Sequence, residues 1–309
     1  MTTPELGDAA PADRAGLDAD ALAASLDARE APLLDEEMRS TVLHHGERTR
    51  RVTVLLHGLT ASPRTWKGFA RARFERGENV LVPRMPRHGH ADRMTGALAE
   101  LSAHELLTFA KGVVDAASEL GDRIVVVGHS LGGAVALHLA QHDARVFRAV
   151  AVAPFLGIKQ LPHDWHGFVR RVLARAPNVF LWWDPVDRGR SAPKHGYPRY
   201  TTRSLLAGLA LADALREDAR EGPPRAAHVE IVRNAGETSV NNRTIDDLVA
   251  RWRGAGAKNA RIVRLLGLGP SHDVVEPEHR RSPAARFLPA LHALLDEDPP
   301  PDDRVIAIP

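Results

Sequence analysis

Short apolar runs alternate with amphipathic stretches along most of the chain from about residue 38 onward. Runs such as VTVLLH and NVLVP are brief, almost wholly apolar and rich in β-branched side chains, which is typical of strands buried on both faces of a sheet. The pattern predicts strands at 52–57, 79–83, 124–127, 149–153, 229–232 and 262–266. It predicts helices at 102–119, 131–142, 242–254 and 283–295. Strand–helix units in this order indicate an α/β fold with a mostly parallel central sheet flanked by helices.

The two ends of the chain depart from this alternation. Residues 1–16 are rich in Ala, Pro and Asp and are expected to form a loose tail, and the leucines of 17–34 are spaced like one face of a short helix. We therefore expect an N-terminal tail and short helix over 1–36. The acidic, proline-rich segment 297–309 is expected to be a C-terminal tail.

One interval in the middle is too long for a simple crossover. More than 70 residues separate the strand that ends near Ala153 from the one that starts near His228, and both tyrosines of the chain lie between them. We expect residues 155–227 to be an inserted cap over the strand ends of a core formed by 37–154 and 228–296. The alternative is a small separate packing unit with no role in binding.

Composition narrows the classes of function. The 41 basic and 39 acidic residues of this 309-residue chain give a formal charge of +2 without clustering, so no nucleic-acid partner is expected. There is no cysteine, which excludes disulfides and a thiol nucleophile. No apolar run is long enough for a transmembrane segment, and the N-terminus lacks the pattern of a secretory signal. We expect a cytoplasmic protein, and the sequence leaves its oligomeric state open.

A glycine-rich turn stands between one strand and the helix that follows it. VVVGHSLGGAVAL places Gly128 and Gly132 two residues on either side of Ser130. Glycines at this spacing allow a strand to reverse sharply into a helix, with the serine held at the tip of the turn and at the helix N-terminus. The pattern indicates a nucleophilic Ser130.

A nucleophilic serine also needs donors for an oxyanion. VTVLLHGLTASPRTW places His57 and Gly58 at the end of a strand, so that Leu59 offers a backbone N–H. We expect the oxyanion hole to be formed by the backbone amides of Leu59 and Leu131.

With these two motifs the chain resembles the α/β-hydrolase family, and within it bacterial carboxylesterases and monoacylglycerol lipases, over roughly 50–155 and 228–296. The resemblance implies a base in the loop after the last strand, where LLGLGPSHDVVEP holds His272. Relatives carry an acid after the penultimate strand, where this chain has Glu237 in place of the usual Asp. The order Ser130, Glu237, His272 agrees with that of the family. Rival acids are Asp246, Asp247 and Asp273.

The remaining histidines have simpler interpretations. The segment that contains His88 and His90 resembles a structural turn of the family. The surfaces of ordinary turns or helices suit His44, His45, His138 and His142. His163 and His166 imitate a metal pair without a third ligand nearby. We expect no metal and no cofactor.

These parts favour hydrolysis of a carboxylic ester, with a short- to medium-chain acyl or monoacylglycerol-like substrate, through an acyl-enzyme on Ser130. A thioesterase or acyltransferase of the same fold remains open, as does a ligand-binding receptor that retains the triad. A serine nucleophile argues against haloalkane dehalogenases, which use Asp. Phe180, Trp182 and Trp183 are candidate walls of the pocket, although each could instead pack the cap on the body.

Overall fold

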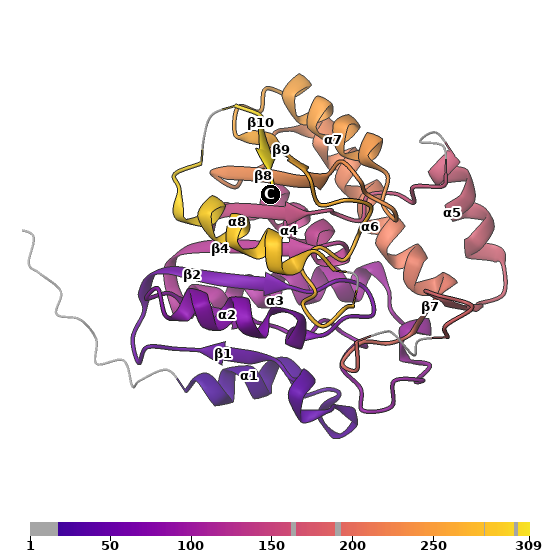
Figure 1. Ribbon diagram of the computed structural model, residues 1–309, viewed down its shortest axis with the longest axis horizontal. Coiled ribbons are helices and arrows are strands. Elements are labelled where there is room, and N and C mark those ends of the chain that lie inside the picture. Colours follow the sequence, from indigo (N-terminus) through magenta and orange to yellow (C-terminus); the bar gives the residue numbers. More distant parts are fainter. Residues whose placement is uncertain (1–17, 162–164, 189–192, 281, 300–301) are drawn as a thin grey trace, which may run out of the picture.

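The computed structural model describes residues 18–161, 165–188, 193–280, 282–299 and 302–309. The tail expected over 1–16 lies outside the described residues. Within them, eight strands form one sheet in the order β1-β3-β2-β4-β5-β8-β9-β10 (Figure 1). Only the β1–β3 pair is antiparallel, so the expectation of a mostly parallel sheet is confirmed. The strands of this sheet are β1 (Thr41–Leu43), β2 (Thr49–Leu56), β3 (Asn79–Val82), β4 (Gly121–His129), β5 (Val146–Val152), β8 (His228–Asn234), β9 (Ala260–Leu266) and β10 (Arg304–Ala307).

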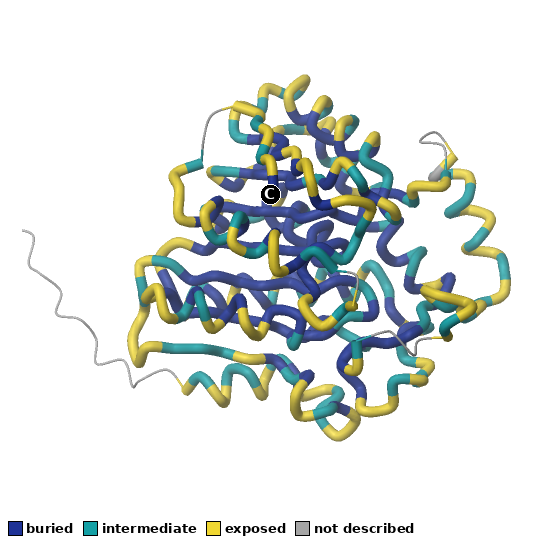
Figure 2. Tube along the Cα trace, in the orientation of Figure 1, coloured by how far each residue is buried: buried dark blue, intermediate teal, exposed yellow. Residues whose placement is uncertain are grey.

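Helices cover both faces of the sheet, and the strands between them are the most deeply buried part of the chain (Figure 2). α3, α4, α6 and α7 pack on one face, and α2 and α8 on the other. The α-helices are α1 (Ala19–Asp27), α2 (Lys67–Phe74), α3 (Ala103–Leu120), α4 (Leu131–His142), α5 (His166–Arg175), α6 (Thr202–Glu221), α7 (Asn242–Gly254) and α8 (Ala284–Asp296). Short 3₁₀ helices span Ala31–Leu33, Glu36–Met38, Pro63–Trp66 and Ala97–Ala99. None of the described helices is long and apolar enough to cross a membrane.

Two apolar cores result from the alternation of side chains along each strand. Val52 and Val54 of β2 point into the core shared with α3 and α4, whereas Leu55 points into the core shared with α2 and α8. Strands buried on both sides therefore read as continuous apolar runs, which is why the sequence predicted them.

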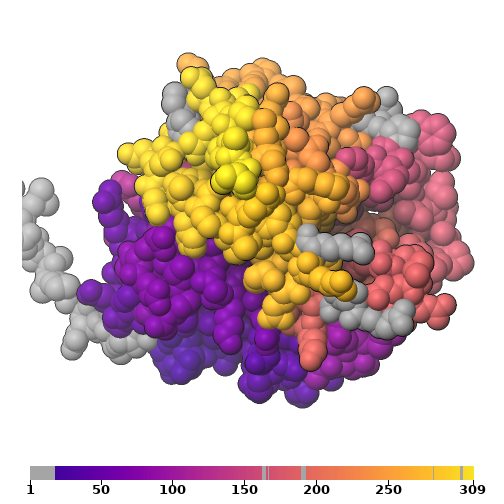
Figure 3. Space-filling model, in the orientation of Figure 1, coloured from indigo at the N-terminus to yellow at the C-terminus, as the bar shows by residue number. Residues whose placement is uncertain are grey.

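Segments distant in sequence meet on the face that carries α2 and α8, where early residues (purple) adjoin late ones (yellow) in Figure 3. Arg73 of α2 is buried and pairs with Asp296 at 2.6 Å, and Arg51 donates to the carbonyl of Leu295 at 2.9 Å. These contacts fasten the C-terminal helix to the first strands of the sheet. Because α8 follows β9 along the chain, these contacts also link the end of the chain to its beginning.

The interval between β5 and β8 divides into two parts. α5 and the antiparallel hairpin of β6 (Phe180–Trp182) and β7 (Arg199–Thr201) lie outside the main sheet. α6 instead buries Leu211 and Leu215 in the core, and its Gly208 lies against Phe155 and Leu131. The sequence predicts one insertion over 155–227. Because α6 covers the sheet, we propose that the cap ends where α6 begins.

The segment 297–309, expected to be a C-terminal tail, contains a strand. Residues 304–307 form β10, which pairs in parallel with β9, and Ile308 is buried and donates to the carbonyl of Leu266 at 2.9 Å. Only four residues make this edge strand, and the acidic proline run before them hid the short apolar alternation of RVIAI. The tail adds an eighth strand to the sheet.

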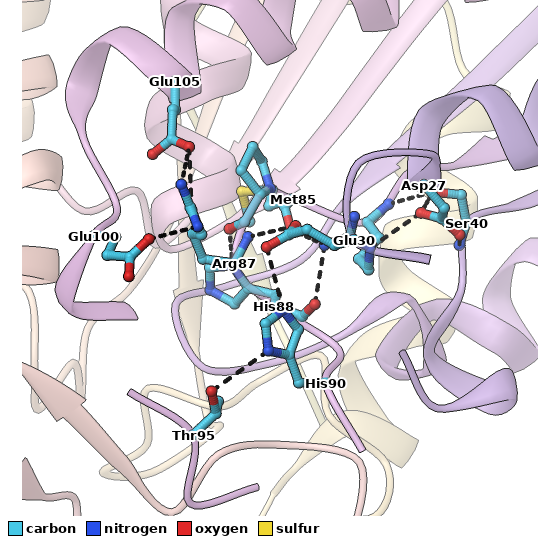
Figure 4. Close-up of polar contacts among 12 residues, drawn as sticks. Asp27, Glu30, Ser40, Met85, Arg87, His88, His90, Thr95, Glu100 and Glu105 are labelled. Carbon is cyan, nitrogen blue, oxygen red and sulfur yellow. Dashed lines mark hydrogen bonds and ion pairs between the residues drawn. The ribbon is translucent and has the colours of Figure 1, made fainter. Parts of the chain in front are cut away.

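The N-terminal segment is held by a buried ionic cluster beside the loop after β3 (Figure 4). Arg84 donates to Asp27 at 3.0 Å and to Glu30 at 2.7 Å. Glu30 also contacts the ring of His90 at 3.2 Å and accepts from the Arg87 amide at 3.0 Å. Burial raises the pKa of Glu30, but hydrogen bonds from these partners and the charge of Arg84 outweigh it and lower the pKa to about 2.

Glu30→Gln is expected to lower the free energy of unfolding relative to wild type. The loss should be larger at neutral pH than at acid pH. A carboxylate whose pKa is lower in the folded state stabilises the fold above its ordinary pKa of 4.5 and loses that effect as the pH falls towards about 2. Denaturant unfolding of both proteins between neutral pH and pH ~3 measures the difference in the free energy of unfolding. The difference should shrink as the pH falls below 4.5, and a pH-independent difference would contradict the assigned cluster.

Candidate active site

The turn between β4 and α4 holds Ser130 in a strained backbone conformation. Its φ is 53° and its ψ is −116°, a combination that residues other than glycine seldom adopt. The turn is held from both sides, because the Ser130 amide donates to the carbonyl of Val152 at 3.0 Å and its carbonyl accepts from Phe155 at 2.9 Å. The serine is thereby fixed at the carboxyl edge of the sheet.

The glycines around Ser130 are required by close backbone approaches. A Cβ at Gly128 would collide with the carbonyl of Gly132, and a Cβ at Gly132 would collide with the carbonyls of Leu56 and His57. Gly58 stands against the serine itself, since a Cβ there would lie 3.4 Å from that of Ser130. Strand β2, the turn and α4 therefore approach one another as closely as backbones can.

His272 and Glu237 form a hydrogen-bonded series with Ser130. The Nε2 of His272 lies 2.9 Å from the Ser130 Oγ, and its Nδ1 lies 3.0 Å from the Glu237 Oε1. The same carboxylate oxygen accepts from the amides of Thr238 and Ser239, each at 2.7 Å. These amides fix the longer Glu side chain where an Asp would usually stand.

The charges of this series reinforce one another. Burial alone lowers the pKa of His272, but the hydrogen bond and negative charge of Glu237 raise it above the ordinary value of 6.5. Burial raises the pKa of Glu237, and the contact with His272 and the backbone amides lower it below 4.5. The two groups thus favour an imidazolium beside a carboxylate, the pair that forms when His272 takes a proton from Ser130.

The rival acids lie elsewhere. Asp246 pairs with Arg233 at 2.6 Å, and Asp247 pairs with Arg251 one helical turn away at 2.8 Å. Asp273 contributes only its negative charge near His272 and none of the hydrogen bonds described to that ring.

The loop after β2, which carries the proposed oxyanion donor Leu59, lies beside Ser130. Among the turns and loops of the described residues, the backbone amides of Leu59 and Leu131 donate to no carbonyl. Both N–H groups can therefore donate to an oxyanion. His57 holds this loop in place, because its Nδ1 donates to the carbonyl of Gly58 at 2.9 Å and its Nε2 accepts from the Met85 amide at 3.1 Å. Burial keeps the pKa of His57 well below 6.5, so the ring is neutral and can make both bonds.

His129 lies inside the glycine turn, and the sequence alone indicates no role for it. Its Nε2 donates to the backbone carbonyl of His272 at 3.0 Å. Burial and the charge of His272 lower the pKa of His129 to about 4. A neutral His129 therefore anchors the loop that carries His272 without competing for its proton.

A cavity of about 450 Å³ opens above Ser130 and His272. Leu59, Trp183 and Tyr197 supply apolar surface to it, and Trp183 donates from its indole to the Thr60 hydroxyl at 2.8 Å. Phe180 and Trp182, also expected in the wall, are not among the described residues that line this cavity. Trp183 follows directly after β6 and lines the cavity.

The cavity also has a polar wall that no sequence pattern predicts. His195, contributed by the segment between β6 and β7, lies 3.3 Å from the carboxylate of Glu276 and 3.0 Å from the Ser62 hydroxyl. Thr65 donates to the same Glu276 oxygen at 2.7 Å. Nothing around His195 in SAPKHGYP distinguishes it from a surface histidine. The cluster joins the segment between β6 and β7 to the loops that carry Leu59 and His272.

The sequence predicts no metal or cofactor site. The two histidines that imitate a metal pair, His163 and His166, cannot be assessed from the described residues. His163 and the side chain of His166 both lie outside the described residues. The cavity is lined by the proposed nucleophile Ser130 and the proposed base His272, and the buried Glu237 contacts His272 from behind; together the three can carry out acyl transfer.

Comparison with known proteins gives one family and a common fold. A family model described as the alpha/beta hydrolase family matches residues 53–302. The fold is similar to a structure of the metagenome-derived lipolytic enzymes LipS and LipT, with a TM-score of 0.64 and 16% identity over 86% of this chain and 100% of that one. It is also similar to a monoacylglycerol lipase of Paleococcus ferrophilus, with a TM-score of 0.63 and 18% identity over 83% and 97%.

A soluble variant of monoglyceride lipase from Saccharomyces cerevisiae matches with a TM-score of 0.61 and 13% identity over 84% of this chain and 90% of that one. At these identities the likeness concerns the fold alone. Uncharacterized proteins of Mycobacterium bovis and Mycobacterium tuberculosis are 32% identical over 102 residues, which is 32% of this chain. The match spans only 28% of the length of these relatives.

Proposed function

The chain belongs to the alpha/beta hydrolase family, and on that premise we propose that it cleaves carboxylic esters through an acyl-enzyme on Ser130. The observation that carries the proposal is the series of hydrogen bonds from Ser130 through His272 to Glu237, at 2.9 and 3.0 Å. A serine in this arrangement loses its proton to the imidazole as it attacks, while the carboxylate holds the imidazolium.

The reaction proceeds in two halves. His272 takes the Ser130 proton as Oγ attacks the acyl carbon, and the amides of Leu59 and Leu131 donate to the resulting oxyanion. Collapse of this intermediate breaks the ester bond, and His272 gives its proton to the leaving alkoxide. Water then attacks the acyl-enzyme, His272 takes its proton and returns it to Ser130, and the carboxylic acid leaves.

The cavity supports a substrate with an apolar acyl group and a polar alcohol. Its volume of about 450 Å³ suits a small ligand. Trp183 and Leu59 offer apolar contact, while Thr238, Ser239 and Asp273 offer hydrogen-bonding groups on another part of the lining. Short- to medium-chain acyl esters and monoacylglycerols combine these two features, and two proteins of similar fold are named monoacylglycerol or monoglyceride lipases.

A series of p-nitrophenyl esters from acetate to decanoate, together with a monoacylglycerol and an acyl thioester, tests the proposal. We expect turnover of the oxygen esters, with a maximum at short or medium chain length. Faster cleavage of the thioester would favour a thioesterase. No turnover of any of these substrates, with binding of a ligand retained, would favour a receptor.

Trp183→Ala is expected to change the preference between acyl chains and leave the chemistry on acetate nearly intact. Trp183 lines the cavity from the cap, whereas Ser130 and His272 belong to the body. Trp182→Ala is the matched control, since its side chain is absent from the described lining. We expect the ratio of kcat/KM for decanoate and acetate to shift in the first variant only, and an equal loss on both esters would contradict this role.

A further inference from the structure

Two histidines and a carboxylate converge at the far end of α4 from Ser130. His138 and His142 are one helical turn apart, and their ring centroids lie 4.4 Å apart. Asp218 of α6 faces them, with its Oδ2 3.0 Å from the His142 Nε2. One ligand atom from each of the three residues lies within 4.8 Å of the others. Histidines at this spacing present both rings on the same helix face, as in helical zinc sites.

The surroundings leave these groups available to a cation. The Nδ1 of His138 is buried and has no hydrogen-bond partner among the described residues. Gln141, between the two histidines, donates to the backbone carbonyl of Asp218 at 3.3 Å and so ties α4 to α6 beside the cluster.

The geometry is close to that of a three-ligand metal site. A tetrahedral zinc with bonds of roughly 2.0–2.2 Å holds its ligand atoms about 3.3–3.5 Å apart. The His142 and Asp218 atoms are already at 3.0 Å, and His142 and Asp218 are both partly exposed, so modest side-chain rotations suffice. Two imidazoles and a carboxylate suit a borderline divalent cation such as Zn²⁺ rather than Mg²⁺ or Ca²⁺.

We propose that His138, His142 and Asp218 form a Zn²⁺-binding site that fastens α4 to α6. α4 starts directly after Ser130, and His138 and His142 follow Ser130 by 8 and 12 residues, so the site lies about 12–18 Å from the nucleophile along the helix. It takes no part in the chemistry at Ser130. α6 starts directly after β7, so a metal here stabilises the helix from which the hairpin of the cap extends.

Isothermal titration of the EDTA-treated, full-length protein with ZnCl₂ tests this site. We expect one equivalent to bind with a micromolar or lower Kd and to raise the Tm. His142→Ala and Asp218→Asn should each weaken binding by about tenfold or more and abolish the rise in Tm. Both positions are partly exposed, so the variants are expected to fold. His104→Ala, at an exposed histidine of α3, is the matched control and should bind as wild type does.

Two results would overturn the proposal. One is the absence of stoichiometric binding by wild type at ~100 µM Zn²⁺, well above a micromolar Kd. The other is unchanged affinity in both the His142→Ala and the Asp218→Asn proteins, which would place any bound zinc elsewhere. Neither depends on ester turnover, so the zinc site and the proposed function stand or fall separately.

Discussion

Ser130→Ala is expected to lower ester turnover by roughly 10⁴–10⁶-fold, because the acylation step loses its only nucleophile. The fold should remain, since the contacts that hold the turn are made by the backbone of Ser130 and by the neighbouring glycines. Steady-state kinetics on p-nitrophenyl acetate, with a melting curve for each protein, measure both effects.

Ser62→Ala is the matched control for this variant. Ser62 is a second buried serine whose hydroxyl contacts a histidine, His195, at 3.0 Å. Its backbone is extended, without the strained turn that holds Ser130, and it precedes only a short 3₁₀ helix, so its loss should cost less than about tenfold in kcat. A Ser130→Ala protein that keeps a tenth of wild-type turnover would show that Ser130 is not the nucleophile.

Glu237→Gln is expected to reduce turnover by well over tenfold, since the amide supports the imidazolium of His272 far less than the carboxylate does. It should also move the pH profile. His272 acts as a base only when neutral, so activity rises as the pH passes its pKa, which Glu237 holds above 6.5. Removing the negative charge lowers that pKa and shifts the acid limb of the kcat profile to lower pH.

Asp246→Asn and Asp247→Asn are the controls for the acid. Their carboxylates pair with Arg233 and Arg251, away from His272. Turnover and the acid limb should both be nearly unchanged in these proteins. A large loss in either, with a mild one in Glu237→Gln, would move the acid into α7.

Much of the fold could be predicted because its strands are buried on both faces. The buried parts of β2 and β4, residues 52–56 and 124–127, are apolar at nearly every position, which marks them without any knowledge of their partners. β1 and β10 are three and four residues long at the edges of the sheet, and their pairing depends on neighbours distant in the sequence. α6 has an apolar face like any other helix, and only its packing shows that it belongs with the sheet.

The candidate site divides in the same way. Ser130 could be predicted because the turn requires glycine at Gly128 and Gly132, and such a requirement is visible in the sequence. The positions of Glu237 and His272 came from the family resemblance, since the spacing of residues along the chain does not reveal which loops meet. His195 and Glu276 belong to segments that approach only in the folded protein, and no local pattern indicates them.

Labelling with a fluorophosphonate, followed by mass spectrometry of the digested protein, tests the central claim most directly. The reagent forms a stable adduct with a serine activated by a neighbouring base, and it reports on the nucleophile whatever the natural substrate is. We expect one adduct, on the peptide that contains Ser130, with parallel loss of ester turnover and no adduct in Ser130→Ala. A protein that hydrolyses esters yet carries its adduct on another residue, or none at all, would contradict the assignment of Ser130 as the nucleophile.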